Sequence, residues 1–413
     1  MPGPGMELIG KEEKEALMEV IDSGYLYRYG DIANPKFKAM VWNLEKEFAN
    51  YVGSNHALAV TSGTSALLTS LWSLGIGPGD EVIVPGYTFI ASITSIIFAR
   101  AIPILAEIDK TLTLDPDDVV QKISPRTKAI MLVHMLGNSG HLDKFQKIAQ
   151  DHDLLLIEDC AQAFGATFKG KSVGTYGNIG AFSLNVYKTI TAGDGGMVVS
   201  DNEDLYKRAF AIHDQGHLPL RQGVEQGKRT VLGLNFRMNE LTAAVARAQL
   251  KKVGTIKSLL HEKKQILKEK LSNIDEIEFR EILEENGDVG TLLTFFMPTK
   301  EKARMLAQKL GTSTIADSGW HVYNNMEHFL DQKTVTDEGC PFTCPYYTAS
   351  RVKYHKGMLP QTDELLSRAI NISIGVSDAG LGSAYGIRIT SSEKEIKEKA
   401  TFISAKIKEA LEN

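Results

Sequence analysis

Between about residues 56 and 250 the chain alternates short apolar or β-branched runs with longer amphipathic stretches. The apolar runs predict strands, and the amphipathic stretches between them predict crossover helices. Six strands are predicted in this way, at Ala57–Thr61, Glu81–Pro85, Pro103–Glu107, Ala129–His134, Leu154–Glu158 and Gly196–Ser200. The alternation is typical of an α/β domain built on a parallel sheet, whose ligands bind at the carboxyl ends of the strands.

A charge-rich helical pattern runs from Ala243 to Lys270 and predicts a long helix between two domains. Beyond about residue 275, strand-like segments such as Leu292–Met297 alternate with helical ones such as Lys302–Leu310, which favours a smaller α+β unit. A chain of 413 residues also exceeds the size at which one core keeps growing. We therefore expect a large α/β domain with an N-terminal arm over residues 1–250 and a smaller domain over residues 251–413.

The composition is that of an ordinary globular protein, with 43% hydrophobic and 23% charged residues. The net charge of -5 is spread without long runs of one sign, so electrostatics give no reason to expect nucleic acid or an anionic membrane as a partner. The N-terminal residues lack the apolar core of a secretory signal, and no transmembrane stretch is visible. A small-molecule partner is favoured.

Three cysteines are too few to cross-link a chain of this length, and they indicate a reducing, cytoplasmic setting. Cys340 and Cys344 fall in Thr334–Tyr354, a segment without periodicity that we predict to be a loop. Their spacing would suit half of a metal site, but no second pair of Cys or His ligands follows at a suitable distance. We expect reduced, structural thiols and no metal.

A phosphate site is indicated where the first predicted strand meets a helix, at Ser62-Gly63-Thr64-Ser65. The free N–H groups of a helix start bind anions, and Gly63 permits a close backbone approach. Ser and Thr also favour helix starts for purely local reasons, so a simple helix cap explains the same residues.

An acidic pair, Glu158 and Asp159, ends the fifth predicted strand. A carboxylate at this place can keep a pyridine nitrogen protonated, as an electron-sink cofactor requires, although an acid that caps the next helix is an equal alternative. Further along, Lys188 lies among Ser, Thr and Gly residues ahead of a Gly-Gly entry into a strand. Such a lysine can form a Schiff base with a carbonyl compound, and an ordinary surface lysine is the alternative.

Taken together and in this order, these segments resemble the DegT-type sugar aminotransferases. The resemblance runs from Gly24 to about Arg368, and its most specific pieces are residues 62–67, 84–91, 158–163, the segment around Lys188, and 233–240. It implies the fold of the pyridoxal-phosphate-dependent transferases of fold type I, which are aspartate aminotransferase-like. That fold has a large domain with a mainly parallel seven-stranded sheet and a smaller α+β C-terminal domain.

The resemblance also implies roles for individual residues around pyridoxal 5'-phosphate, with Lys188 as the catalytic residue that carries the cofactor as a Schiff base. Asp159 would pair with the pyridine nitrogen, and Gln162 would meet the ring hydroxyl. The other implied cofactor-binding residues are Gly63, Thr64 and Ser183 at the phosphate, Phe89 stacked on the ring, and Asn235 at the phosphate of the neighbouring subunit. The last role implies a homodimer with shared active sites, although a turn residue after Gly233 is the simpler interpretation of Asn235.

Two histidines are candidates for the substrate side of the site. His321 lies where the relatives place a substrate-side histidine, and His134 lies at the end of the fourth predicted strand; structural roles are equal alternatives for both. The region after Leu359-Pro360 departs from the usual Pro-rich family pattern, which leaves the sugar side of the pocket open.

Met1-Pro2-Gly3, the segment Ala106–Leu112 and the surroundings of Trp320 are similar to a narrower branch of the family. That branch makes 8-amino-3,8-dideoxy-octulosonate for the lipopolysaccharide core. Nucleotide-linked keto hexoses are the broader expectation for the family.

The resemblance therefore implies an aminotransferase that moves an amino group from glutamate to a keto sugar. The product would serve surface polysaccharide, lipopolysaccharide or a glycosylated metabolite. A sugar dehydratase of the same family is an alternative, but the family's dehydratases carry histidine in place of the lysine, and Lys188 argues against it. A regulatory homologue without turnover is a second alternative; it would be supported by an appended DNA-binding module, and none is visible.

Overall fold

The structure is a computed structural model that describes residues 3–219, 229–347 and 352–412. Its central feature is a seven-stranded sheet of order β1-β9-β8-β5-β4-β2-β3. These strands are β1 (His56–Val60), β2 (Glu81–Pro85), β3 (Ile102–Ala106), β4 (Thr127–Val133), β5 (Leu155–Asp159), β8 (Ile179–Ser183) and β9 (Gly196–Ser200). All six predicted strands are confirmed to within two residues at each end, and so is the α/β class.

The sheet is mainly parallel, and β9 is the strand that runs antiparallel to both of its neighbours, β1 and β8. The prediction of a parallel strand at β9 was therefore wrong. The connection from β8 to β9 contains no crossover helix, and a parallel pair needs such a crossover. The pattern analysis also missed β8, because its sequence, Ile-Gly-Ala-Phe-Ser, contains three small residues that weaken the strand signal.

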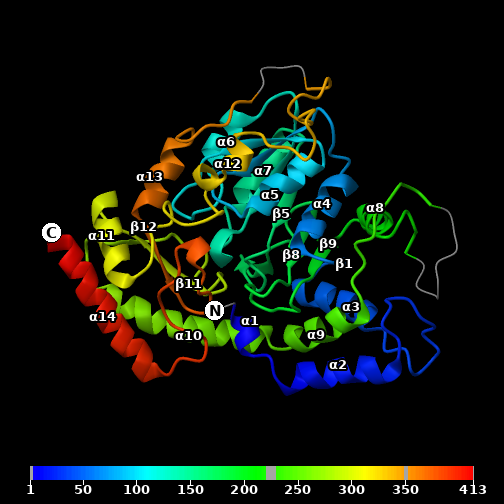
Figure 1. The fold of residues 1–413 in the computed structure, drawn as a ribbon, viewed down its shortest axis with the longest axis horizontal. Helices are drawn as coiled ribbons and strands as arrows, with labels where there is room; N and C mark the ends of the chain where they lie inside the picture. Colours follow the sequence, from blue (N-terminus) through cyan, green and yellow to red (C-terminus); the bar gives the residue numbers. More distant parts are fainter. Residues whose placement is uncertain (1–2, 220–228, 348–351, 413) are drawn as a thin grey trace.

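Helices cover both faces of this sheet (Figure 1). In the large domain they are α1 (Pro4–Glu7), α2 (Lys11–Ser23), α3 (Met40–Val52), α4 (Gly63–Ser73), α5 (Ile90–Phe98), α6 (Pro116–Lys122), α7 (Leu142–Asp151), α8 (Glu203–His213) and α9 (Glu240–Leu250). The alternation along β1 separates two cores: Ala57 and Ala59 pack with α3 and α9, whereas Leu58 and Val60 pack with α4 and α5. A short 3-10 helix, η1 (Met135–Gly137), follows β4, and a small hairpin pairs β6 (Thr167–Phe168) with β7 (Lys171–Ser172).

The C-terminal part has its own antiparallel sheet of order β10-β11-β12. Its strands are β10 (Glu278–Phe279), β11 (Leu292–Phe296) and β12 (Ala369–Ser373). Its α-helices are α10 (Val253–Leu271), α11 (Lys300–Leu310), α12 (Glu327–Leu330), α13 (Pro360–Arg368) and α14 (Glu393–Glu412). Two short 3-10 helices are η2 (Tyr323–Asn325) and η3 (Ala379–Leu381). The predicted long helix is in fact two, because Lys251 and Lys252 separate α9 from α10. No helix in the described ranges has both the length and the apolar composition needed to cross a bilayer.

Candidate active site

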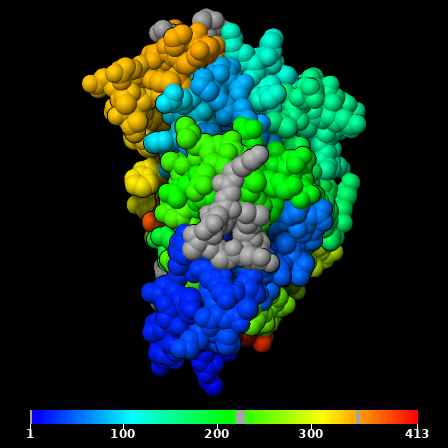
Figure 2. Space-filling view, turned by 90° about the vertical axis from the view of Figure 1, so that its right-hand side faces the viewer, coloured from blue at the N-terminus to red at the C-terminus, as the bar shows by residue number. Residues whose placement is uncertain are grey.

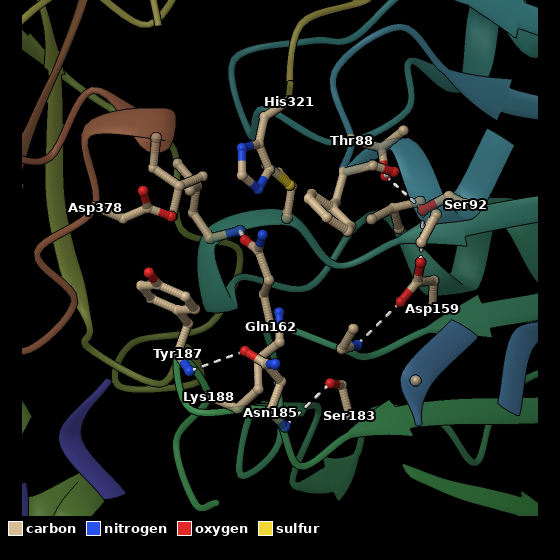
Figure 3. Close-up of a pocket in the computed structure, with 18 of the residues that line it drawn as sticks. Thr88, Ser92, Asp159, Gln162, Ser183, Asn185, Tyr187, Lys188, His321 and Asp378 are labelled. Carbon is tan, nitrogen blue, oxygen red and sulfur yellow. Dashed lines mark hydrogen bonds between the residues drawn. The ribbon is translucent and has the colours of Figure 1, made fainter. Parts of the chain in front are cut away.

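A cavity of about 400 Å³ lies at the carboxyl ends of β4, β5 and β8 (Figure 3). Val133, Asp159 and Ser183, the last residues of these strands, line it. The C-terminal part closes the opposite side with residues that follow β11 and β12. This position agrees with the rule that ligands of open α/β sheets bind beyond the carboxyl ends of the strands.

The N-terminus of α4 forms one wall of the cavity. Ser62 caps the helix by accepting a hydrogen bond of 3.0 Å from the N–H of Ser65, while Gly63 and Thr64 line the cavity. A Cβ added at Gly63 would lie 2.7 Å from the Cβ of Ser183, so only glycine lets the end of β8 approach this closely. The first turn therefore serves as a capped helix start and also presents N–H groups suited to an anion.

Asp159 lies on the floor of the cavity and is 3% exposed. Ser92 Oγ donates a hydrogen bond of 2.7 Å to its Oδ2, and the N–H of Ala161 donates one of 3.0 Å to its Oδ1. Burial nevertheless raises the pKa of this carboxyl, because the two donors only partly compensate for lost hydration. A cation placed against Asp159 would restore the charged form.

Lys188 lies on the loop between β8 and β9, where its side chain lines the cavity. Burial lowers its pKa from the ordinary value of 10.5, and this effect outweighs the attraction of Asp159 and Asp378. The loop is fixed by hydrogen bonds from Lys188 N–H to the carbonyl of Asn185 and from Asn185 N–H to Ser183 Oγ. A neutral amine is therefore more accessible here than on an exposed lysine.

Gln162 is oriented by an unusual turn in the wall of the cavity. Its Oε1 accepts a hydrogen bond of 2.9 Å from the N–H of Leu136, which has a left-handed backbone with φ of 55°. Arg280 is buried and donates to the carbonyls of Met135 and Leu136, which stabilises the turn. Because Oε1 is engaged, the amide nitrogen of Gln162 is the group left to meet a ligand.

His321 and Phe89 form the upper wall, with ring centroids 5.2 Å apart. His321 Nδ1 donates a hydrogen bond of 2.9 Å to the carbonyl of Gly380, since a carbonyl can only accept. Burial lowers the pKa of His321 to about 4, so the ring is neutral near pH 7 with a lone pair on Nε2.

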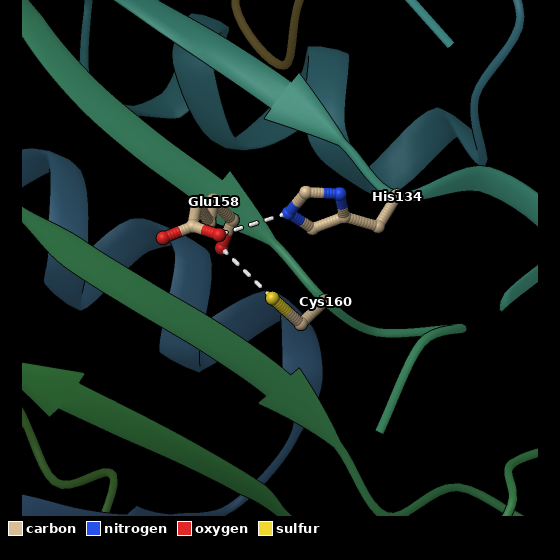
Figure 4. A group of neighbouring side chains, drawn as sticks. All are labelled: His134, Glu158 and Cys160. Carbon is tan, nitrogen blue, oxygen red and sulfur yellow. Dashed lines mark hydrogen bonds and ion pairs between the residues drawn. The ribbon is translucent and has the colours of Figure 1, made fainter. Parts of the chain in front are cut away.

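His134 and Asn235 do not line this cavity in the described part of the chain. His134 is buried and its Nε2 lies 3.0 Å from Glu158 (Figure 4). Glu158 also accepts hydrogen bonds from the N–H groups of Gly174, Tyr176 and Gly177. Cys160 completes a cluster whose geometry could hold a metal ion. Burial and the charges of Glu158 and Asp159 raise the pKa of the Cys160 thiol well above 9. We interpret the cluster as a hydrogen-bonded clasp that holds the end of β5, because both Glu158 oxygens already accept two donors each.

Eight of the predicted residues line the cavity together: Gly63, Thr64, Phe89, Asp159, Gln162, Ser183, Lys188 and His321. Sequence reasoning missed Ser92, although it lies one helical turn beyond Phe89 and faces the same side. It also missed Asp378, since Ser377-Asp378-Ala379-Gly380 looks like any acidic surface turn. Only the packing of the C-terminal part against the sheet brings this residue to the site.

Comparison with known proteins agrees with this geometry. The profile of the DegT/DnrJ/EryC1/StrS aminotransferase family matches residues 7–377. The chain is 32% identical to GDP-perosamine synthase of Vibrio cholerae over 87% of this chain and 90% of that protein. It is 37% identical to 3-amino-5-hydroxybenzoate synthase of Amycolatopsis mediterranei over 72% of this chain and 76% of that one.

Solved structures give the same result for the fold. An aminotransferase from Psychrobacter cryohalolentis superimposes with a TM-score of 0.80 and 26% identity, covering 99% of both chains. A 3-amino-5-hydroxybenzoic acid synthase superimposes with a TM-score of 0.77 and 29% identity, covering 98% of this chain and 99% of that one.

Proposed function

The chain belongs to the DegT/DnrJ/EryC1/StrS aminotransferase family, and on this premise we propose that it moves an amino group from glutamate to a keto sugar. As a member of this family it is a pyridoxal-phosphate-dependent aminotransferase, and its relatives act in amino-sugar biosynthesis. The single observation that carries the proposal is the meeting of Lys188 and Asp159 in one cavity with the start of α4.

The residues of the cavity fit pyridoxal 5'-phosphate. The close approach of Gly63 to Ser183 leaves N–H groups and hydroxyls where a phosphate would bind, and a Cβ at Gly63 would remove this space. Asp159 is a buried carboxyl whose raised pKa calls for a cationic partner, which a protonated pyridine nitrogen would supply.

We assign the holding roles accordingly. Gly63, Thr64 and Ser183 would hold the phosphate, Phe89 would stack on the ring, and Gln162 would donate its amide N–H to the ring hydroxyl. When bound, the cofactor supplies an electron sink for the carbon that loses or gains its proton. Lys188 would hold the cofactor through Nζ, and the same Nζ would then move that proton, which its lowered pKa favours at neutral pH.

A homodimer is the second part of the proposal. Figure 2 shows the N-terminal residues, in dark blue, on the same face as the residues that follow β9, in green. The guanidinium of Arg237 lies over the ring of Tyr27, which joins the two segments. Large apolar side chains exposed on these two segments include Leu26, Tyr27, Ile32, Leu232 and Leu234. Exposed apolar groups of this kind mark interfaces, and two-fold dimers are the commonest assembly. Asn235, next to Leu234, would then reach the phosphate of the partner's cofactor.

The keto sugar itself is proposed at the level of class. GDP-perosamine synthase is the name of several relatives, which supports a nucleotide-linked sugar. The octulosonate branch is the narrower proposal. The three cysteines are free in the structure, which supports a reducing, cytoplasmic location.

Borohydride reduction tests the central assignment. We expect the purified protein to be yellow and borohydride to fix the cofactor on Lys188, where peptide mass spectrometry would find it. Lys257 is the matched control, because burial lowers its pKa as well but it donates to the carbonyl of Gly165 outside the cavity. Lys257→Ala should retain the adduct, whereas Lys188→Ala should lose it. An adduct on a different lysine would overturn the proposal.

The donor and acceptor are tested by half-reactions. Glutamate should bleach the yellow form of the wild type, and an amino sugar should bleach it in reverse. Suitable amino sugars are 8-amino-3,8-dideoxy-octulosonate and GDP-perosamine. Bleaching by amino acids alone would contradict the sugar acceptor.

A further inference from the structure

One wall of the cavity presents two hydrogen-bond acceptor atoms, one on Asp378 and one on His321. Neither atom accepts a hydrogen bond from another residue that the structure describes. Asp378 Oδ1 accepts a hydrogen bond of 2.8 Å from Gly380 N–H, whereas its Oδ2 has no donor or cation in bonding range within the described ranges. His321 uses Nδ1–H for Gly380, so its Nε2 is the second acceptor. Figure 3 shows both side chains beside the cavity.

Asp378 lies close to the reacting centre. Its charge acts on Lys188, where it opposes the lowering of the lysine pKa. It comes from the segment after β12, so it faces the cavity from the side opposite α4 and the proposed phosphate groups.

The chemistry of this wall selects for hydroxyl groups. The charged side chains that line the described cavity are three carboxylates, Asp159, Asp194 and Asp378, and one cation, Lys188; no arginine is among them. An O–H group placed against Asp378 would satisfy its free oxygen, whereas a carboxylate or phosphate at that one point would be repelled. Trp320, which is 62% exposed at the same cavity, adds an apolar face suited to a sugar ring.

We propose that Asp378 is a specificity-determining residue whose Oδ2 accepts a hydrogen bond from the hydroxyl group next to the reacting carbonyl carbon of the keto sugar. The inference rests on the proposed function and extends it. A site built to bind a hydroxyl discriminates against an analogue that lacks it, because the partly buried acceptor then loses that hydrogen bond. The amino donor carries no such hydroxyl, so this hydrogen bond makes no contribution to the donor half-reaction.

Asp378→Asn is the test variant because it alters only one edge of the side chain. The amide oxygen of asparagine can still accept from Gly380 N–H, while an NH₂ donor replaces the free acceptor. Ser383→Ala is the matched control. Ser383 Oγ stabilises the same turn by donating to the carbonyls of Val376 and Asp378, but it does not line the cavity. If Asp378→Asn does not fold, Asp378→Ser is used in its place, because the serine hydroxyl can still accept a hydrogen bond within the turn.

The experiment compares each amino sugar with its deoxy analogue in the reverse half-reaction. The pairs are 8-amino-3,8-dideoxy-octulosonate with its 7-deoxy analogue, and GDP-perosamine with its 3-deoxy analogue. The pair whose parent reacts faster with the wild type is used. Affinities are also measured by calorimetry on the Lys188→Ala background, which binds without turnover.

We expect the wild type and Ser383→Ala to prefer the parent by about tenfold to a hundredfold, as a hydrogen bond to a charged group provides. In Asp378→Asn the preference should fall to about threefold or less, both in kcat/KM and in affinity, whereas the glutamate half-reaction loses no such hydrogen bond and should change less than the reaction of the parent sugar. An unchanged preference in Asp378→Asn would overturn the role of Asp378 alone. Equal losses with glutamate and the sugar would show a merely structural role. Failure of the wild type to react with either parent would instead overturn the proposed function.

Discussion

Ser92 Oγ donates a hydrogen bond of 2.7 Å to Oδ2 of Asp159, across the gap between α5 and the end of β5. Thr88 Oγ1 lies 2.6 Å from the same Ser92 oxygen, so two hydroxyls in series stand behind the carboxylate. Ala161 N–H holds the other carboxylate oxygen. The side chain is therefore fixed in one orientation before any ligand arrives, and its charge can be used without rearrangement.

Replacing Asp159 with Asn should separate cofactor binding from catalysis. Size and hydrogen-bonding capacity are nearly retained, but the negative charge that would keep the pyridine nitrogen protonated is lost. We expect the variant to stay yellow while its half-reaction with glutamate slows by two or more orders of magnitude, about 3 kcal/mol of barrier. Stopped-flow absorbance measures this. Conversion at the wild-type rate would show that the assignment of Asp159 is wrong.

Ser92→Ala should give a smaller effect in the same assay. One hydrogen bond to a charged carboxylate is lost, so we expect a slowing of about tenfold to a hundredfold and a further rise of the Asp159 pKa. Ser95→Ala is the matched control. Ser95 lies on the same helix, is also buried and donates to the carbonyl of Ser92, but does not line the cavity. Equal rates for the two variants would show that the hydrogen bond from Ser92 to Asp159 does not contribute to the half-reaction.

The sequence predicted most of the sheet and eight residues of the cavity because these features are local. Gly63 and Asp159 follow strands, and the carboxyl ends of parallel strands meet at one edge. Ser92 and Asp378 depend instead on how α5 and the segment after β12 pack against that edge, which no local pattern records. The antiparallel direction of β9 was not predicted for a related reason. The direction of a strand depends on the path of the connection before it, which here is the loop that carries Lys188.

The N-terminal segment supports this loop from behind. Gly3 N–H donates a hydrogen bond of 2.8 Å to the carbonyl of Val186, and a Cβ on Gly3 would clash with Tyr187 and lie 2.6 Å from the carbonyl oxygen of Lys188. Backbone atoms can move aside only if the whole loop shifts. We therefore expect Gly3→Ala to displace the loop that carries Lys188 and to weaken cofactor affinity about tenfold, or about 1.4 kcal/mol.

Gly10→Ala serves as the control for this prediction, since its nearest neighbour would be a flexible glutamate oxygen at 3.7 Å. Absorbance titration of the cofactor-free protein with pyridoxal 5'-phosphate measures the affinity. An unchanged Kd in Gly3→Ala would mean that the loop holds its position without the N-terminal segment.

Shared active sites can be tested by mixing two inactive variants. In a dimer of Lys188→Ala and Asn235→Ala chains, one site would carry both changes and the other neither. If subunits exchange freely, half the dimers are mixed, and activity should return to about a quarter of the wild-type sites. Each variant alone should stay inactive after the same treatment. Exchange proven by mass spectrometry without recovered activity would count against sharing.

The last prediction concerns acid stability and His213, which is fully buried next to Arg28. Arg28 donates a hydrogen bond of 2.9 Å to its Nε2, because a guanidinium can only donate, and Nδ1–H faces the carbonyl of Phe210. Burial, together with the charge of Arg28, lowers the pKa of His213 from 6.5 to about 3. A pKa that is lower in the folded state gives stability that is complete above pH 6.5 and is lost as the pH falls towards 3.

Each pH unit below 6.5 should thus remove about 1.4 kcal/mol, or about 2 kcal/mol between pH 6.5 and 5. Urea unfolding at pH 7.5 and pH 5 would measure the change in the free energy of unfolding. His213→Gln cannot take up the proton, so we expect it to lose about 2 kcal/mol less than the wild type over this interval. His152→Gln alters an exposed histidine and should behave as the wild type does. If His213→Gln lost as much stability as the wild type, proton uptake by His213 would not contribute to acid unfolding.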